Sequence, residues 1–128
     1  MKRISALVVC LLGFSAAAHA ATLASPSIFG SHAQSVARCT ALNGGSVPIT
    51  LTVKILTESG AVWDSRTITL APGDFTALTE PIQIGVAYSC TVTAGVSLAN
   101  VRAALIIDEP VEYQGSFVPR PIRSAALR

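Results

Sequence analysis

The stretch VPITLTVKILT, residues 47–57, decides the fold class of this chain. Its apolar and polar side chains alternate: Ile49, Leu51, Val53 and Ile55 interleave with Thr50, Thr52 and Lys54. A period of two puts successive side chains on opposite faces of a strand, whereas a helix needs a period near 3.6. The stretch is therefore predicted to be a half-buried β-strand.

Five further runs around this stretch have strand character, and turns rich in Gly, Pro and Asn separate them. They span residues 36–41, 61–70, 75–79, 85–94 and 100–108. In the second run Val62 and Trp63 cannot both face inward without a bulge. In the turn before the third, Pro72 presets φ and Gly73 accepts a positive φ. We expect an all-β domain of two antiparallel sheets packed face to face, with a closed barrel as the alternative.

The first twenty residues have the features of a cleaved signal peptide. Lys2 and Arg3 precede an apolar run, residues 4–14, and Ala18-His19-Ala20 forms a small-x-small cleavage signal before Ala21. The run is about eleven residues long, against roughly 20 for a membrane-spanning helix. A lipoprotein site at Cys10 is the other alternative, but bulky Val9 precedes it. We therefore expect export to the periplasm or the extracellular space, with no membrane span in the mature form.

Charge indicates no particular class of partner. The chain has nine basic and seven acidic residues, and two of the basic ones, Lys2 and Arg3, leave with residues 1–20. The mature chain is then formally neutral. Neither a nucleic acid nor an anionic membrane surface is expected as its partner.

The cysteines predict one disulfide. Once Cys10 is removed with the signal segment, Cys39 and Cys90 remain as an even pair in a chain bound for an oxidising compartment. A bridge closing a loop of this length stabilises a fold by roughly 4 kcal/mol in the chain-entropy model. A redox thiol is the alternative, but no Cys-x-x-Cys spacing is present.

The triplet Tyr88-Ser89-Cys90 matches the Tyr-x-Cys arrangement of a tyrosine corner, and residues 36–108 as a whole resemble an immunoglobulin-like sandwich. Trp63 departs from that pattern, because it follows Cys39 by 24 residues and lies in a different strand from the usual core tryptophan. The chain is also similar to small exported bacterial proteins of unknown function. The matching positions are Cys39, Asn43-Gly44, residues 48–56, Gly60, residues 70–73, residues 88–90 and residues 101–103. This resemblance implies no activity.

The domain boundaries follow from these patterns. Residues 21–35 are expected to be an irregular N-terminal arm or a weak edge strand, and residues 36–109 the sandwich. Residues 110–128, which contain Pro119 and Pro121, are expected to be a flexible tail, although Phe117-Val118 offers an additional edge.

Metal and cofactor sites are not expected. His32 is the only histidine after residue 20, so a two-histidine site cannot form. Asp108, Glu109 and Glu112 are close in sequence, and a hard cation is one interpretation of them. A solvated, acidic strand exit is the interpretation we favour, because no Asp-x-Asp loop is present.

Catalysis is not expected either. The chain has no Gly-x-Ser-x-Gly elbow and no glycine-rich phosphate loop followed by a helix. A glycosidase needs two carboxyl groups, and Asp64, Asp74 and Glu80 are the candidates. Surface or turn positions are the ordinary role of such residues, so we predict that the protein is not an enzyme.

Four residues are candidates for a binding surface. Trp63 starts a strand beside a hairpin, where it either packs in the core or offers a stacking face. Leu56 and Ile106 are apolar residues at outward positions. Arg102 lies on the outer face of the last strand, where it is either solvated or paired with an acidic neighbour such as Glu80. The Tyr88 hydroxyl is expected to satisfy a backbone group.

Three functional classes remain open. The leading hypothesis is a non-enzymatic interaction domain that binds another protein or an envelope component, with exposed strand edges open to β-augmentation. The second is a pilin-like or fimbrial subunit whose arm, residues 21–34, donates a strand, although Pro26 and Gly30 interrupt its alternation. The third is a small secreted hydrolase or an enzyme inhibitor that uses loop 43–48 or loop 95–100.

Overall fold

The computed structural model describes residues 20–29, 35–113 and 116–128, which form nine β-strands and no helix. The strands are β1 (Ala21–Ala24), β2 (Ile28–Phe29), β3 (Val36–Asn43), β4 (Ile49–Thr57), β5 (Val62–Leu70), β6 (Phe75–Pro81), β7 (Ala87–Ala94), β8 (Val101–Tyr113) and β9 (Ser116–Ala126). The all-β class is confirmed. The expected signal peptide, apart from Ala20, lies outside the described residues, as does His32. In the described part of the chain, no helix has the length and apolar character to cross a membrane.

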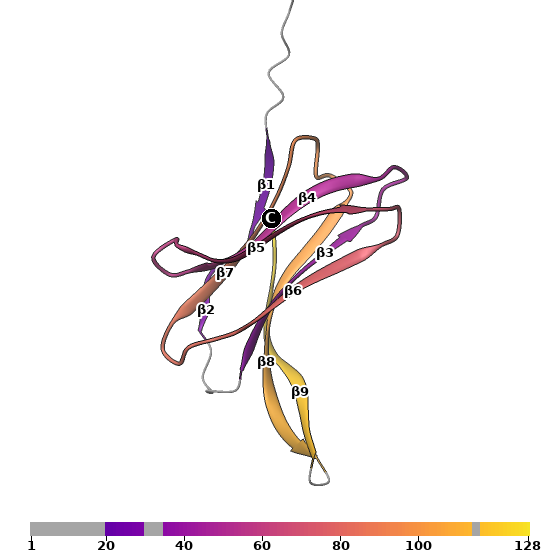
Figure 1. Cartoon of the computed structure of the whole chain (residues 1–128). Coiled ribbons are helices and arrows are strands. Elements are labelled where there is room, and N and C mark those ends of the chain that lie inside the picture. Colours follow the sequence, from indigo (N-terminus) through magenta and orange to yellow (C-terminus); the bar gives the residue numbers. More distant parts are fainter. Residues whose placement is uncertain (1–19, 30–34, 114–115) are drawn as a thin grey trace, which may run out of the picture.

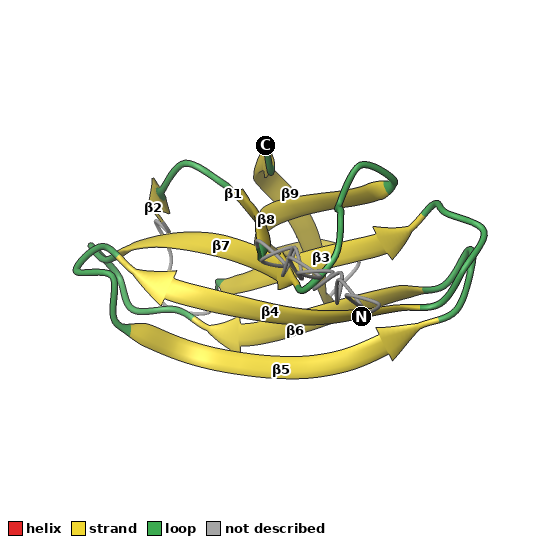
Figure 2. Cartoon of the chain, turned by 90° about the horizontal axis from the view of Figure 1, so that it is seen from above, coloured by secondary structure: helices red, strands yellow, loops and turns green. Residues whose placement is uncertain are grey.

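The strands form two antiparallel sheets. Sheet A has the order β1-β7-β4-β5, with β2 also paired to β7, and sheet B has the order β6-β3-β8-β9. Figure 1 shows the β8–β9 hairpin extending beyond the rest of the molecule. In Figure 2, β5 and β6, each an outer strand of its own sheet, run next to one another along one flank. Strands β1, β8 and β9 lie at the opposite flank.

The core lies between the sheets and follows the alternation of the sequence. The four apolar residues expected to point inward from β4 are all buried, and Thr50 between them is exposed. On β7 the buried set includes Tyr88, Cys90 and Val92, as expected. The strand that decided the fold class therefore forms the centre of sheet A, between β7 and β5.

A disulfide crosses the core and joins the two sheets. Cys39 of β3 is bonded to Cys90 of β7, with Cα atoms 5.8 Å apart, and both side chains are fully buried. The predicted pairing is confirmed. Because β3 belongs to sheet B and β7 to sheet A, the bond fixes the sheets against each other.

Three local predictions are also confirmed. The Tyr88 hydroxyl accepts a hydrogen bond from the Gln83 backbone N–H at 2.9 Å, as expected of a tyrosine corner. Gly73 has φ 82°, in the left-handed region that its turn requires. The β4–β5 pairing passes from Ile55↔Asp64 to Leu56↔Val62, which leaves Trp63 as the extra residue of a bulge.

The C-terminal region differs from expectation. Where we expected a flexible tail, residues 110–113 complete β8, and β9 pairs with β8 through Ala126. The prediction of a flexible tail was wrong because it relied on the prolines of this segment. β9 is an edge strand, and an edge strand tolerates proline, which lacks a backbone N–H. The N-terminal arm takes the weak-strand alternative, since β1 and β2 both pair with β7.

Candidate functional site

The outer face of sheet A is lined by hydroxyl groups. Its Oγ1 atoms pair across β4 and β5: Thr50 lies 2.7 Å from Thr69, and Thr52 lies 2.9 Å from Thr67. The β7 residues opposite β4 on this face continue the pattern with Thr93, Thr91 and Ser89. Threonine suits both the pleated backbone and water, so this face is compatible with exposure.

The outer face of sheet B combines apolar side chains with Thr40, Thr79, Arg38 and Arg102. One row across three strands contains Phe75, Leu42 and Arg102, and the next row contains Ala77, Thr40 and Ala104. Phe75 is 73% exposed and Leu42 is 39% exposed. A shallow groove of about 430 Å³ runs along these residues. We use the name sheet B face for Leu42, Phe75, Ala77, Ala104, Ile106 and Arg102.

An ion pair lies beyond Ile106 on the same side of sheet B. Arg38 Nη2 is 2.7 Å from Asp108 Oδ2, and the Asp108 side chain is only 5% exposed. The expected solvated strand exit is therefore wrong for Asp108. The bond to Arg38 occupies one oxygen of this buried carboxylate, while Asp108 Oδ1 and Arg38 Nε have no hydrogen-bond partner among the described residues.

A cation site at this position is not supported. Asp108 and Glu109 are consecutive in β8 and so point to opposite faces of the sheet. The Glu112 side chain lies outside the described part of the structure. Among the described residues, no group of three or more His, Cys, Asp or Glu side chains is arranged to hold a metal.

The four predicted binding residues do not form one surface. Ile106 and Arg102 lie on the sheet B face, whereas Leu56 lies on the outer face of sheet A, opposite Val62. Trp63 lies at the β5 edge, 41% exposed, with its ring edge-on to buried Tyr88 at a centroid distance of 6.1 Å. Trp63 thus contacts buried Tyr88 and is partly exposed, so the stacking role stays a prediction.

Arg102 does not contact Glu80. Its Nη1 donates to the backbone oxygens of Ala99 at 3.0 Å and Val101 at 3.2 Å. These two carbonyl groups hold the guanidinium beside the loop that precedes β8, on the surface of the molecule.

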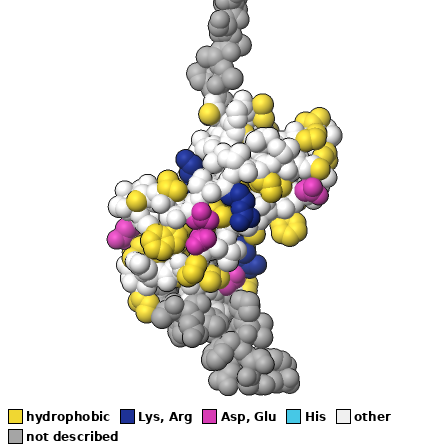
Figure 3. Space-filling view, in the orientation of Figure 1, with side chains coloured by type: hydrophobic (Ala, Val, Ile, Leu, Met, Phe, Trp, Pro, Cys, Tyr) yellow, Lys and Arg dark blue, Asp and Glu magenta, His cyan; other side chains and the backbone are white. Residues whose placement is uncertain are grey.

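Two of the three candidate carboxylates meet between β5 and β6. Glu80 shares a hydrogen bond with Asp64, and Arg66 lies close enough to interact with its charge. Partial burial is the largest cause that raises the pKa of Glu80 above 4.5, the Asp64 hydrogen bond and charge raise it further, and Arg66 opposes them. Figure 3 shows acidic and basic side chains together near the middle of the view, where β5 and β6 run.

This pair does not have the geometry of a glycosidase. Hydrogen-bonded carboxyl groups are closer than the spacing of roughly 5 Å or more that separates the two catalytic groups of those enzymes. Asp74, the third candidate, is exposed in the turn before β6 and is not part of the cluster. The arrangement places Glu80, with its raised pKa, between two sheet edges.

The two candidate inhibitor loops lie side by side. The Gly44 N–H donates to the Asn100 backbone oxygen at 2.9 Å, and a hollow of about 320 Å³ lies between the loops. Buried Asn43 holds the first loop, because its Nδ2 donates to the Val47 and Leu70 backbone oxygens and its Oδ1 accepts from the Gly45 N–H. Val47 and Val96 are exposed on the two loops.

The sheet B face was largely missed by the sequence reasoning. Arg102, Ala104 and Ile106 were recognised as outward residues, but Phe75, Leu42 and Ala77 were not. The available signal was the period of two in β3 and β6, which places Leu42 and Phe75 outward once the inward residues are known. The register that aligns them as neighbours comes from the fold alone.

Comparison with known proteins shows a similarity of fold to one solved structure. No protein-family model matches the chain, and no curated protein matches its sequence. The structure is similar to the crystal structure of Thermotoga maritima 1070, with a TM-score of 0.52 and 12% sequence identity over 82% of this chain and 90% of that one. At this identity, the similarity shows a shared arrangement of strands alone.

Proposed function

We propose that this chain is an exported, non-enzymatic interaction domain that binds another protein through the sheet B face. The observation that carries the proposal is the exposure of Phe75 beside Leu42, next to the small side chains of Ala77 and Ala104. Aromatic and arginine side chains are enriched in protein interfaces, and Phe75 and Arg102 flank Leu42 in one row. A contiguous apolar patch of this kind marks an interaction site.

The disulfide and the N-terminal sequence support export. Disulfides persist in oxidising compartments, and Cys39–Cys90 is buried at the centre of the fold. Residues 1–20 have the pattern of a signal peptide, and β1 begins at Ala21, directly after the proposed cleavage site. The periplasm or the extracellular space is the proposed location.

The outer strands β5 and β6 favour a face over an edge as the binding element. On β5, Asp64 and Arg66 pair with the inward positions Ile55 and Val53, and the Trp63 bulge interrupts the regular ladder. On β6, Pro81 lies at the end of the strand. Inward charges, bulges and prolines are features that discourage pairing with another strand. β-Augmentation at these two edges is therefore less well supported than contact through the sheet B face.

The architecture we propose is immunoglobulin-like in the broad sense. The cross-sheet disulfide and the Tyr88 corner support this. One difference from the immunoglobulin arrangement is the place of β8. In immunoglobulins the strand that follows the second cysteine strand pairs with it, whereas β8 crosses to pair with β3.

An enzyme inhibitor is the second candidate. The adjoining loops expose Val47 and Val96 at one end of the molecule, where one or two protruding loops would be enough to block a partner's cleft. A fimbrial subunit is less well supported, because β1 is already paired with β7 of its own chain and is not free to be donated.

Site-specific photo-crosslinking in cells that export the protein tests the proposal. A photoreactive phenylalanine analogue at position 75 is compared with the same analogue at Thr67, an exposed residue on the outer face of sheet A. We expect a discrete adduct with another protein from position 75 and none from position 67. Equal labelling from both positions, or no adduct from position 75, would overturn the proposal.

A further inference from the structure

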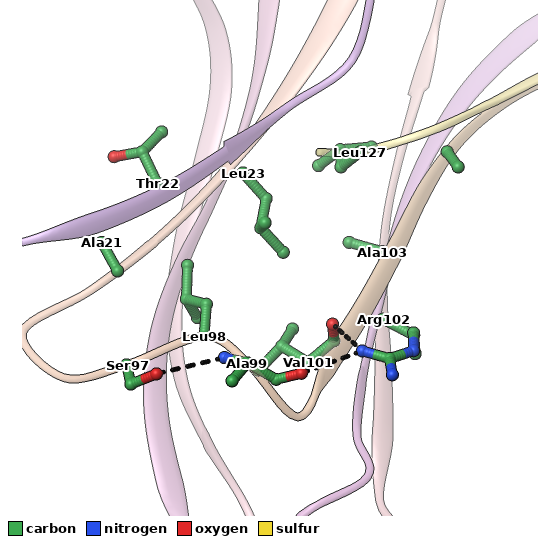
Figure 4. A pocket seen from close by; sticks show the side chains of 11 residues that line it. Ala21, Thr22, Leu23, Ser97, Leu98, Ala99, Val101, Arg102, Ala103 and Leu127 are labelled. Carbon is green, nitrogen blue, oxygen red and sulfur yellow. Dashed lines mark hydrogen bonds between the residues drawn. The ribbon is translucent and has the colours of Figure 1, made fainter.

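A hollow of about 610 Å³ opens at the flank where β1 of sheet A faces β8 and β9 of sheet B. Figure 4 shows three leucines that point toward a common space: Leu23 of β1, Leu98 of the loop between β7 and β8, and Leu127 after β9. Val101 lies at the base of this space. Leu98, Val101 and Leu127 also belong to the hydrophobic core. The floor of the hollow is therefore continuous with the protein interior.

The hollow exists because small residues stand at its walls. Ala21 of β1, Ala103 of β8 and Ala126 of β9 line it, at positions where larger side chains would fill the space. Backbone bonds hold the flank in shape: Arg128 and Ala24 exchange two hydrogen bonds of 3.0 and 3.1 Å, and the Leu127 N–H donates to the Ala103 oxygen. Its volume falls within the range of roughly 300–1,000 Å³ of small-molecule sites.

The Arg102 guanidinium borders this apolar space. Arg102 lines the hollow, and its Nη1 is held by the Ala99 and Val101 carbonyl groups. Among the described residues, Arg102 forms no ion pair with a carboxylate. The remaining guanidinium N–H groups are therefore available to an oxyanion, since a guanidinium has five donors in a fixed planar arrangement.

We propose that the hollow binds a small amphiphile that has an apolar chain and a carboxylate head group, a fatty acid in its simplest form. The chain lies against Leu23, Leu98 and Leu127, and the carboxylate accepts hydrogen bonds from Arg102. This site is separate from the proposed protein contact, which is centred on Phe75. Arg102 and Ala103 border both, so a substitution at either one alone cannot distinguish them.

Titration with decanoate below its micelle concentration, followed by methyl NMR, locates the site. We expect saturable shifts of the Leu23, Leu98 and Leu127 methyl groups, while Leu42 on the sheet B face and Val62 on sheet A stay unchanged. Decanol should bind about tenfold more weakly, because it lacks the charge-assisted hydrogen bonds of the carboxylate. Decyltrimethylammonium should bind more weakly still. Equal affinity for all three, or shifts that do not saturate, would overturn the proposal.

Two variants separate the head-group contact from the chain contact. Arg102→Gln should weaken decanoate binding about tenfold and leave decanol binding unchanged. Arg66→Gln is the matched control on an exposed arginine of β5 and should change neither. Ala103→Leu fills the hollow and should weaken both ligands, whereas Ala77→Leu, outside the hollow, should not. Unchanged binding in Ala103→Leu contradicts the proposal.

Two more variants serve as a replacement and a control for the decanoate experiment. If Ala103→Leu does not fold, Ala21→Leu narrows the same hollow from the β1 side and replaces it. Phe75→Thr should leave decanoate binding unchanged. Retained decanoate binding in Phe75→Thr supports a hollow separate from the sheet B face, and lost binding would contradict it.

Discussion

The outer faces of the two sheets are built by the same alternation but have opposite chemistry. On sheet A the outward residues of β4 and β5 are largely threonines, and their hydroxyl groups pair across the strands. On sheet B the outward residues include Phe75, Leu42, Ala77, Ala104 and Ile106. Both faces cover the same core, so the core does not explain the difference. Under the proposed function, sheet A faces water and sheet B faces a protein partner.

The largest expected loss of stability comes from removing the disulfide that joins the two sheets. Replacing both cysteines, Cys39→Ala and Cys90→Ala, should lower the free energy of unfolding by about 4 kcal/mol, because the bond closes a separation of 51 residues. Guanidinium denaturation followed by circular dichroism measures it. Wild-type protein unfolded in the presence of reductant should show the same midpoint as the variant. A midpoint that reduction leaves unchanged would mean that the bond does not stabilise the fold.

The second largest expected loss of stability comes from breaking the Arg38–Asp108 ion pair, which lies within sheet B. Asp108→Asn breaks the pair with Arg38, and we expect a loss of about 2 kcal/mol. This is below the usual cost of breaking a buried pair, because the Arg38 side chain is 38% exposed and water still reaches it. Urea denaturation provides the measurement. Arg102→Gln, which breaks contacts with backbone oxygens on the surface, is the control and should cost less. Equal losses would show that the burial of Asp108 has no energetic consequence.

A pair of substitutions sharpens the contrast between the faces. Thr52→Ala should lower stability by roughly 0.5–1 kcal/mol, since it removes a cross-strand hydroxyl pair and a strand-favouring side chain. Phe75→Thr should stay within about 0.5 kcal/mol of wild type, because its side chain is exposed. It should also weaken the adduct formed by the same photoreactive analogue placed at the neighbouring position 42. Thermal unfolding measures the stability of both variants. A large loss for Phe75→Thr would assign the ring a structural role in place of a binding one.

The smallest effect lies at the boundary between the sheets and depends on pH. The pKa of Glu80 is raised in the folded state, so folding favours its protonated form. The stabilisation is present below the ordinary value of 4.5 and is lost as pH rises through the raised pKa. Glu80→Gln, which mimics the protonated form, should therefore have a higher melting temperature than wild type at pH 7 and the same one at pH 4.

The neighbouring carboxyl group supplies the control for that experiment. In Asp64→Asn the hydrogen-bonded negative charge beside Glu80 is gone, so Glu80→Gln in this background should show a smaller dependence on pH. A difference between Glu80→Gln and its parent that stays constant from pH 4 to pH 7 would contradict the raised pKa of Glu80. Calorimetry at four or five pH values is sufficient to decide.

The sequence was enough to predict the strands between residues 36 and 108, because apolar and polar residues alternate in them, most regularly in β3, β4 and β7, where one face is buried. The disulfide followed from an even cysteine count, and the Tyr88 contact from the Tyr-x-Cys triplet. Strand β9 was missed because its stabilisation comes from pairing with β8, which a pattern containing Pro119 and Pro121 does not reveal.

The candidate site was harder to predict than the fold for a similar reason. Phe75, Leu42 and Arg102 are 33 and 60 residues apart in the chain, and strand pairing alone makes them neighbours. Arg102 also contradicted the charge-pair expectation, because two nearby backbone carbonyl groups hold its guanidinium. Local patterns fix which face a side chain occupies, whereas a surface depends on register between distant strands.

The position of the disulfide also has a mechanical consequence. A force that pulls the two ends of the domain apart acts on a chain whose middle is closed by Cys39–Cys90, so the intervening residues cannot be drawn out while the bond lasts. With a separation of 51 residues, this withholds roughly 170 Å of extended chain. Strands β1, β8 and β9 can be stripped away, but β4, β5 and β6 stay within the closed loop. The oxidised domain is thus an extensible element of limited reach, and reduction converts the same chain into a much longer tether.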